Sequence, residues 1–268
     1  DLLLVFGASF SNHTGITPKK PIIQVDMDPL ALGKIHPVQV PVWGEISITS
    51  KLMLDAVKGN NSATDQTSEV AERWKIWDAE KQKRLQEDHG NGISSVAVFD
   101  AMNKVVQPNA VMAVDVGNNT YSFGRYFECQ EQSVLMSGYL GSIGFALPAA
   151  MGAWAAVGDK RPIWSVSGDG GLGQYLADLT TWVKYDMNIT HVLLSNSELG
   201  KISKEQRAAE LDVWKTQLVN PNFAEYANNC GALGIRVEKR EDLVSAMEKA
   251  RDHNGPALID IVCDVNLI

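Results

Sequence analysis

Two polar side chains that suit metal binding stand at the ends of two apolar runs. Asp169 lies in SGDGGLG, directly after the run PIWSVS, and Asn196 ends the next run, ITHVLLSN, twenty-seven residues later. If these runs are neighbouring parallel strands, their C-terminal loops lie about 5 Å apart, and the two side chains can share one cation. Carboxylate and amide oxygens favour Mg²⁺ or Ca²⁺ over zinc. Glycines beside Asp169 also leave backbone N–H groups free to contact a diphosphate.

Two other interpretations of the Asp169 segment are a bare turn and a nucleotide-binding loop. GDGGLG begins like GxGxxG, but no acidic residue ends a second strand about 20 residues later. The segment also lacks the GK[ST] of a P-loop, and VSGDGG lacks the nucleophile elbow of serine hydrolases. The histidines show no metal-ligand spacing and are predicted to be surface or satisfied core residues: His13, His36, His89, His191 and His253.

From about Ile93 onward, helical and strand-like segments alternate. The strand-like segments are residues 110–115, 162–168, 189–196, 234–238 and 257–265. The helical segments are 94–106, 142–157, 173–185, 222–232 and 240–252, and a loop is expected at 116–122. This alternation predicts an α/β fold with a doubly wound parallel sheet and helices on both faces. Ligands of such folds bind outside the C-terminal ends of the strands, where Asp169 and Asn196 are expected.

The first sixty residues predict the C-terminal part of a smaller, Rossmann-like α/β domain. Strands are expected at 2–6 and 22–26, and helices at 29–35 and 46–57. Residues 61–92 combine a polar linker with a charged helix over 70–89, so we expect domains at 1–60 and 93–268. Because the chain opens on an apolar strand, we also expect it to be the C-terminal part of a longer protein.

Composition excludes several classes of protein. The chain has 268 residues, 45% of them hydrophobic, and a formal net charge of −8 without a basic cluster, which argues against a nucleic-acid partner. The three cysteines contain no CxxC pair, which predicts a reducing, cytoplasmic location. The longest apolar run, 144–158, contains a proline and is too short to cross a bilayer.

Several blocks of the sequence resemble one family. One segment begins with GDG at Gly168–Gly170 and ends with SN at Ser195–Asn196, with 24 residues between Gly170 and Ser195. It resembles the GDG…NN signature of thiamine-diphosphate-dependent enzymes. DVGNNTYSFGRY, SGYLGSIGFALPAAMGA, NFAEYANNCGALGIRVEK and GPALIDIV resemble the C-terminal diphosphate-binding domain of the pyruvate oxidase and acetolactate synthase family. The segment 22–45 resembles the end of that family's middle domain.

The resemblance implies a role for each matching residue. Asp169 and Asn196 would bind Mg²⁺ through their side chains, and Glu198 through its backbone carbonyl. Ile143 matches the apolar wedge that bends the cofactor, and the Gly141 carbonyl would accept from the cofactor's 4′-amino group. The diphosphate would contact the two flanking loops, represented by Gly117, Asn118, Asn119, Gly168, Gly170, Gly171, Leu199 and Gly200.

The chain departs from the family pattern at two positions. Ser195 replaces the first Asn of the NN pair, and Lys201 stands where Phe or Met is usual. Glu205, in KISKEQ, matches a glutamate of lactic-type pyruvate oxidases, whereas acetolactate synthases carry a tryptophan there. Together with Ile202, Glu205 favours an oxidase-like decarboxylating site, with an acetolactate-synthase-like carboligase as the alternative. A solvated helix position is the simpler interpretation of Glu205.

The resemblance also implies partners. The substrate would be a 2-oxo acid such as pyruvate, and the acceptor either FAD or a second oxo acid. Asp26 and Asp28 match the region where some members hold the FAD adenosine end, although a strand-end turn before Pro29 explains them equally. The glutamate that activates the cofactor belongs to an N-terminal pyrimidine-binding domain, so this chain alone is predicted to be inactive. We also expect a homo-oligomer, dimer or tetramer, and keep a non-catalytic thiamine-fold subunit as the alternative.

Overall fold

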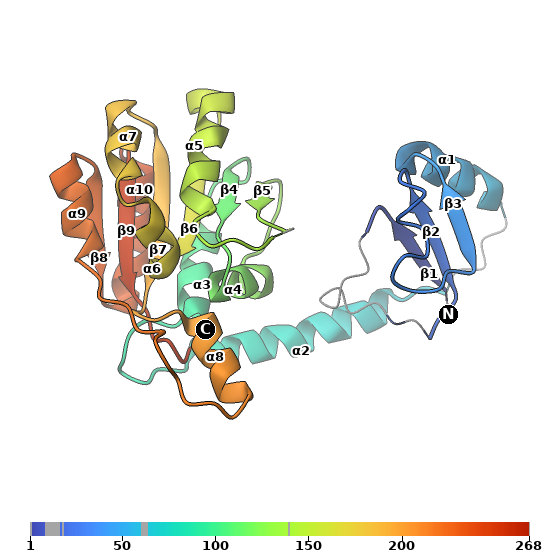
Figure 1. Cartoon of the computed structure of the whole chain (residues 1–268), viewed down its shortest axis with the longest axis horizontal. Helices are drawn as coiled ribbons and strands as arrows, with labels where there is room; N and C mark the ends of the chain where they lie inside the picture. The colour runs from blue at the N-terminus through green and yellow to red at the C-terminus, as the bar shows by residue number, and fades with distance from the viewer. Residues whose placement is uncertain (1, 9–16, 18, 60–63, 139, 268) are drawn as a thin grey trace. The chain divides into compact units, whose positions relative to one another are not determined.

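The computed structural model describes residues 2–8, 17, 19–59, 64–138 and 140–267. The chain forms two compact units, Asp1–Val70 and Ala71–Ile268 (Figure 1). The predicted connector, 61–92, spans their boundary, because helix α2 (Thr67–Leu85) begins in one unit and ends in the other. In the described part of the chain, no helix has both the length and the hydropathy that a membrane span needs.

The first unit contains a parallel sheet with strand order β1-β2-β3. Its elements are β1 (Leu3–Phe6), β2 (Ile22–Asp26), β3 (Val40–Trp43) and α1 (Ile46–Val57). The predicted helix over 46–57 is confirmed, and it begins where the Glu45 carboxylate accepts a hydrogen bond from the Ile48 amide at 2.8 Å. Val5 and Ile22 form the small buried core of this sheet.

The helix predicted over 29–35 is wrong, and the segment forms turns instead. Side chains compete there for the backbone groups that a helix would use. The Gln24 side chain donates to the Ala31 carbonyl at 3.1 Å and accepts from the Gly33 amide at 2.8 Å. Asp28 accepts from the Leu30 amide at 2.9 Å. β3 was not predicted, because Pro41 interrupts a short run that only its pairing with β2 makes a strand.

The second unit is built on a parallel sheet with strand order β5-β4-β6-β7-β9-β8. Its strands are β4 (Val111–Val114), β5 (Ser133–Met136), β6 (Ile163–Gly168), β7 (Ile189–Ser195), β8 (Leu233–Val237) and β9 (Ala257–Val262). Its other helices are α3 (Ser95–Val105), α4 (Asn118–Tyr126), α5 (Ala146–Val157), α6 (Asp169–Leu172), α7 (Asp178–Lys184), α8 (Gly200–Ala208), α9 (Phe223–Cys230) and α10 (Leu243–Arg251). The order reverses between β4 and β6, which is the switch point of a doubly wound sheet.

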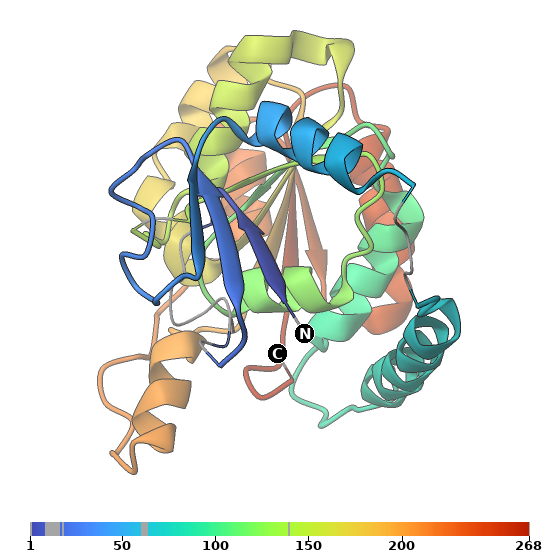
Figure 2. The same cartoon turned by 90° about the vertical axis from the view of Figure 1, so that its right-hand side faces the viewer.

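Helices cover both faces of this sheet, as Figure 2 shows. α3, α4 and α10 pack on one face, and α5, α7 and α9 pack on the other. Successive side chains of β4 point to opposite faces of the sheet. Met112 and Val114 pack in the core under α3, α4 and α10, whereas Val111 and Ala113 pack in the core under α5, α7 and α9. The predicted doubly wound α/β fold is thereby confirmed.

Three segments differ from the prediction around the strand ends. The loop predicted at 116–122 is mostly helix α4. The helix predicted from residue 142 begins only at Ala146. The glycine-rich turn after β6 is a single helical turn, α6, followed by a short 3₁₀ segment, Gly173–Tyr175.

Candidate functional site

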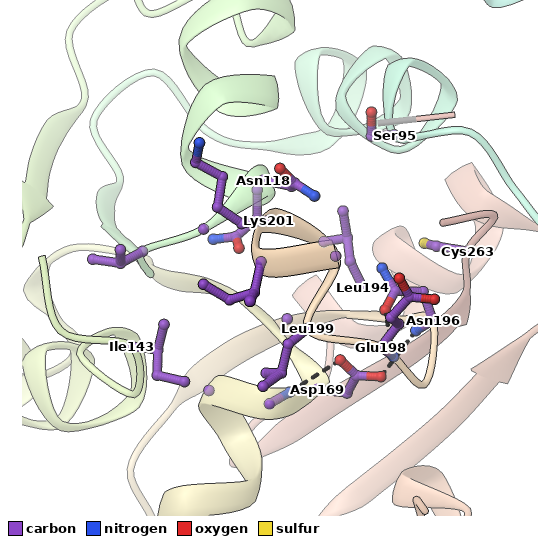
Figure 3. Close-up of a pocket in the computed structure, with 18 of the residues that line it drawn as sticks. Ser95, Asn118, Ile143, Asp169, Leu194, Asn196, Glu198, Leu199, Lys201 and Cys263 are labelled. Atoms are coloured by element: carbon purple, nitrogen blue, oxygen red, sulfur yellow. Dashed lines mark hydrogen bonds between the residues drawn. The ribbon is translucent and has the colours of Figure 1, made fainter. Parts of the chain in front are cut away.

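A cavity of about 310 Å³ lies at the C-terminal ends of β4, β6, β7 and β9 (Figure 3). Its wall contains the residues predicted to bind the cofactor: Gly117, Asn118, Asn119, Gly141, Ile143, Gly168, Asp169, Gly170, Gly171, Asn196, Glu198, Leu199 and Gly200. Lys201 and Ile202 also line it, whereas Glu205 does not. Side chains from well-separated stretches of the chain thus meet at the switch point of the sheet.

Asp169 is a buried acid of this cavity, with only 3% of its surface exposed. Its Oδ2 accepts hydrogen bonds from the amides of Asn196 and Ser197, at 3.0 and 2.6 Å, and from Asn220 Nδ2 at 2.7 Å. Its Oδ1 accepts from the Gly170 amide at 2.9 Å. Burial raises the pKa of this carboxyl, and the four hydrogen bonds oppose that shift. With three of the four donors on Oδ2, Oδ1 is the oxygen with room for a cation.

Asn196 and Glu198 follow β7 in a tight turn, which Ser197 permits by adopting a φ of 58°. The Asn196 side-chain oxygen accepts from the Glu198 amide at 3.0 Å, and the Glu198 carbonyl accepts from the Gly200 amide at 2.8 Å. The Glu198 carboxylate pairs with Arg207 at 3.4 Å. The turn therefore offers an amide oxygen and a carbonyl oxygen beside the Asp169 carboxylate.

This donor set fits a hard divalent cation. The Asp169 Oδ1, Asn196 Oδ1 and Glu198 carbonyl oxygens each accept one protein N–H and keep a further acceptor position. Carboxylate, amide and carbonyl oxygens are the ligands that Mg²⁺ and Ca²⁺ use. Among the described residues, no group of three or more His, Cys, Asp or Glu side chains is placed to hold a metal ion. A metal at this site would therefore be held by the mixed oxygen set.

Helices α4 and α8 both begin at the cavity wall, and neither has a side-chain cap. Gly117 precedes α4 and Leu199 precedes α8, and no side chain accepts a hydrogen bond from the first turn of either helix. Such N-termini present unpaired N–H groups and partial positive charge, which suit an anion such as a diphosphate. Gly170 keeps the wall close, because a Cβ there would lie 2.6 Å from Leu199 Cδ2.

The loop before α5 forms the opposite wall. Ile143 extends from this loop toward the cavity (Figure 3). Gly141 has a φ of 65°, in the left-handed region that favours glycine. An apolar side chain and the oxygens of Asp169 and Asn196 thus line the same cavity.

Lys201 and Glu205 lie at the rim on α8. Lys201 Nζ pairs with Glu205 Oε1 at 2.6 Å and lies 5.3 Å from the centre of the Tyr121 ring. The hydrogen bond to Glu205 is the main reason that the pKa of Lys201 is raised. The Glu205 side chain is 59% exposed. Its nearest chemical partner is therefore Lys201 and not a group inside the cavity.

Sequence reasoning missed several residues of the site. Asn220 donates to Asp169 from a loop fifty-one residues away, and no spacing in the sequence marks it. Asp115, at the end of β4, could have been found from the sequence, because it follows an apolar run much as Asp169 does. Ser95, Cys263 and Asp264 also line the cavity, at the start of α3 and after β9.

Other predicted residues lie elsewhere. Asp26 and Asp28 belong to the first unit, where Asp26 Oδ1 accepts from the Asp28 amide at 2.9 Å, the pattern of a strand-end turn. His191 is fully buried and hydrogen-bonded, as expected of a satisfied core histidine. His13 lies outside the described residues.

Comparison with known proteins identifies a family. A family model described as the thiamine pyrophosphate enzyme, C-terminal TPP binding domain, matches residues 115–261. A Bacillus subtilis protein with the name "Putative thiamine pyrophosphate-containing protein YdaP" is 30% identical over 98% of this chain and 45% of its own length. The acetolactate synthase large subunit of Corynebacterium glutamicum is also 30% identical, over 98% of this chain and 44% of its own. Chloroplastic acetolactate synthase 3 of Brassica napus is 26% identical, over 98% and 42%.

The chain thus spans less than half the length of the relatives that it matches. The matched region begins at Asp115, directly after β4, and ends at Ile261, so it contains β5 to β8, all but the last residue of β9 and most of the cavity wall. These sequence matches confirm the family resemblance. The chain belongs to the thiamine pyrophosphate-dependent enzymes, and its residues 115–261 match their C-terminal TPP binding domain.

Proposed function

We propose that the cavity binds thiamine diphosphate together with Mg²⁺, and that the protein decarboxylates a 2-oxo acid such as pyruvate. The observation that carries this proposal is the set of three oxygens on adjoining loops, from Asp169, Asn196 and Glu198, each with an acceptor position left. When bound, thiamine diphosphate supplies a carbon nucleophile that adds to the keto carbon and takes up the electrons released with CO₂.

The chain's own residues would bind and orient the cofactor. Asp169, Asn196 and Glu198 would hold Mg²⁺ through their oxygens, and the uncapped starts of α4 and α8 would contact the diphosphate. Ile143 would exclude water and hold the middle of the cofactor, and the Gly141 carbonyl would accept from its amino group. A scaffold protein needs no such metal pair beside an apolar wall, which argues against a non-catalytic subunit.

Two acceptors for the decarboxylated fragment are supported by different observations. Relatives named acetolactate synthase support transfer to a second 2-oxo acid. The likeness of Glu205 and Ile202 to pyruvate oxidases supports transfer of electrons to FAD or another oxidant. The position of Glu205 at the rim, paired with Lys201, fits a role in substrate entry better than contact with the reacting carbon.

Binding of the cofactor tests the proposal directly. Titration calorimetry of the whole protein with thiamine diphosphate should show binding that depends on Mg²⁺. Asp169→Asn should lower the affinity by about 100-fold, or about 2.7 kcal/mol, because an amide oxygen replaces the charged ligand. Asp100→Asn, on α3 outside the cavity, is the control and should bind normally. Binding that ignores Mg²⁺, or that survives Asp169→Asn unchanged, would refute the metal assignment.

A further inference from the structure

We infer that Asp115 is a positioning residue that fixes the Ile143 loop at the wall of the cofactor cavity. Asp115 follows β4 and is 1% exposed. Its Oδ1 accepts hydrogen bonds from the amides of Val116, at 2.8 Å, and Phe145, at 3.1 Å. Its Oδ2 accepts from the Gly144 amide at 3.0 Å. Two of its three donors thus belong to the residues directly after Ile143.

The same carboxylate packs against the turn that carries the metal ligand. A Cβ on Gly171 would lie 2.1 Å from Asp115 Oδ2 and 3.2 Å from the Gly144 nitrogen. Gly171 belongs to α6, the helical turn that begins with Asp169. Asp115 therefore occupies the point where the end of β4, the Ile143 loop and α6 meet, with no space between them for a side chain.

The backbone of Asp115 is fixed as firmly as its side chain. Its carbonyl accepts from Asn119 Nδ2 at 2.7 Å and from the Thr120 hydroxyl, both in the first turn of α4. Its amide donates to the Val166 carbonyl of β6 at 2.9 Å. Contacts that do not involve the Ile143 loop thus hold Asp115 in place, so its carboxylate acts as a rigid support for that loop.

A carboxylate is the side chain that this position requires. Both oxygens accept from backbone N–H groups, so an asparagine would place its NH₂ group against at least one N–H donor. Burying a donor against a donor costs more than losing one hydrogen bond. An asparagine should therefore release the Gly144 or Phe145 amide and free the loop that presents Ile143.

The inference rests on the proposed function for its effect on the cofactor, but its first test does not. Hydrogen exchange of the whole protein without ligand should show roughly tenfold faster exchange of the Gly144 and Phe145 amides in Asp115→Asn. Asp260→Asn is a stringent control, because Asp260 is equally buried, accepts the Phe223 amide at 3.2 Å and in addition pairs with Arg236 at 2.6 Å, outside the cavity. Unchanged exchange in a folded Asp115→Asn protein would overturn the inference.

If Asp115→Asn does not fold, two substitutions of Phe145, in the loop that Asp115 binds, test the same contact. Phe145 has a φ of −65° at the position before α5, which proline can adopt, so Phe145→Pro removes the N–H donor without changing that φ. Phe145→Ala loses the same ring and keeps the donor. Faster exchange at Gly144 in the proline variant alone supports the inference, whereas equal exchange in both refutes it.

The affinities for thiamine diphosphate and magnesium pyrophosphate then test whether Asp115 acts on the cofactor through Ile143. Asp115→Asn should weaken thiamine diphosphate binding about tenfold, as Ile143→Ala should, and the double variant should lose no more than either one. Magnesium pyrophosphate, which reaches only the metal end, should bind each variant within about threefold of the parent protein. Additive losses would overturn the positioning role. If the parent protein binds neither ligand, the proposed function fails, and the exchange experiment still decides the role of Asp115.

Discussion

His191, on β7, shows how hydrogen bonds fix the charge state of a buried group. Its ring has no exposed surface, with Ser165 Oγ 2.6 Å from Nδ1 and Ser167 Oγ 2.9 Å from Nε2. Because hydroxyls donate and accept, they satisfy a neutral ring in either tautomer. Burial lowers the pKa of His191 to about 3, so the folded protein keeps the ring neutral.

Stability should therefore fall in mild acid. The unfolded chain binds a proton at His191 below a pH of about 6.5, whereas the folded chain resists until about 3, so acid favours unfolding across that range. Between pH 7 and pH 5 this residue should remove about 2 kcal/mol from the free energy of unfolding. Urea unfolding at both pH values measures it. His191→Gln, which does not titrate, should show a correspondingly smaller pH dependence, and an equal dependence would contradict this account.

At this scale, the sequence was informative where chemistry coincides with a strand end. Asp169 and Asn196 could be predicted because parallel strands place their C-terminal loops together. Asp115 and Asn220 could not be assigned roles, since their partners lie 29 and 51 residues away and their contacts depend on loop conformation. Glu205 was assigned by resemblance alone, and its role as a catalytic residue stays a prediction.

Among the elements, α4 shows why local propensity misleads beside a functional site. Its sequence begins NNTYS, and asparagine and threonine are poor helix formers, which is why a loop was expected. The helix forms because Phe123 and Tyr126, on its second half, are buried against α3 and the sheet. Tertiary packing thus outweighs propensity, and the helix start remains free for a ligand.

Glycines in two helices should respond to substitution in opposite directions. Gly231 ends α9 with a φ of 95°, and a Cβ there would lie 3.3 Å from Val183 Cγ1, so Gly231→Ala should cost about 1–2 kcal/mol of unfolding free energy. Gly152 lies within α5 with open space around its Cα, so Gly152→Ala should add up to about 1 kcal/mol. Chemical denaturation compares the two, and a stabilising Gly231→Ala would contradict the assigned left-handed cap.

For the whole molecule, the alternation of strands and helices was enough to predict the doubly wound class, but not the strand order. β4 pairs with β6, whose residues lie about fifty positions later, and β9 lies between β7 and β8. Such pairings depend on which helix covers which face, information that no single segment contains. The predicted domain limits at 60 and 93 lie on either side of the observed division at 70.

Activity is expected to need more than residues 1–268. The chain spans 45% of its Bacillus subtilis relative, and by family resemblance the activating glutamate belongs to a separate pyrimidine-binding domain. Residues 1–268 should bind thiamine diphosphate with Mg²⁺ but release no ¹⁴CO₂ from labelled pyruvate until that domain is supplied. Formation of acetolactate would then indicate a second 2-oxo acid as the acceptor, whereas reduction of an added dye would indicate electron transfer to FAD or another oxidant. Turnover by residues 1–268 alone would contradict this expectation.

The cavity wall begins at Ser95 and ends at Asp264, so most of the second unit must be folded before the wall exists. A ligand that binds there binds only the folded state, and it stabilises the whole unit through mass action. At a free concentration 100 times its Kd, the gain is about 2.7 kcal/mol. That gain would hide the full cost of a substitution such as Gly231→Ala. The melting temperature of a variant consequently depends on the concentration of the cofactor as well as on packing. In cells with little cofactor, a packing defect would lower the amount of folded protein more than in cells with ample cofactor.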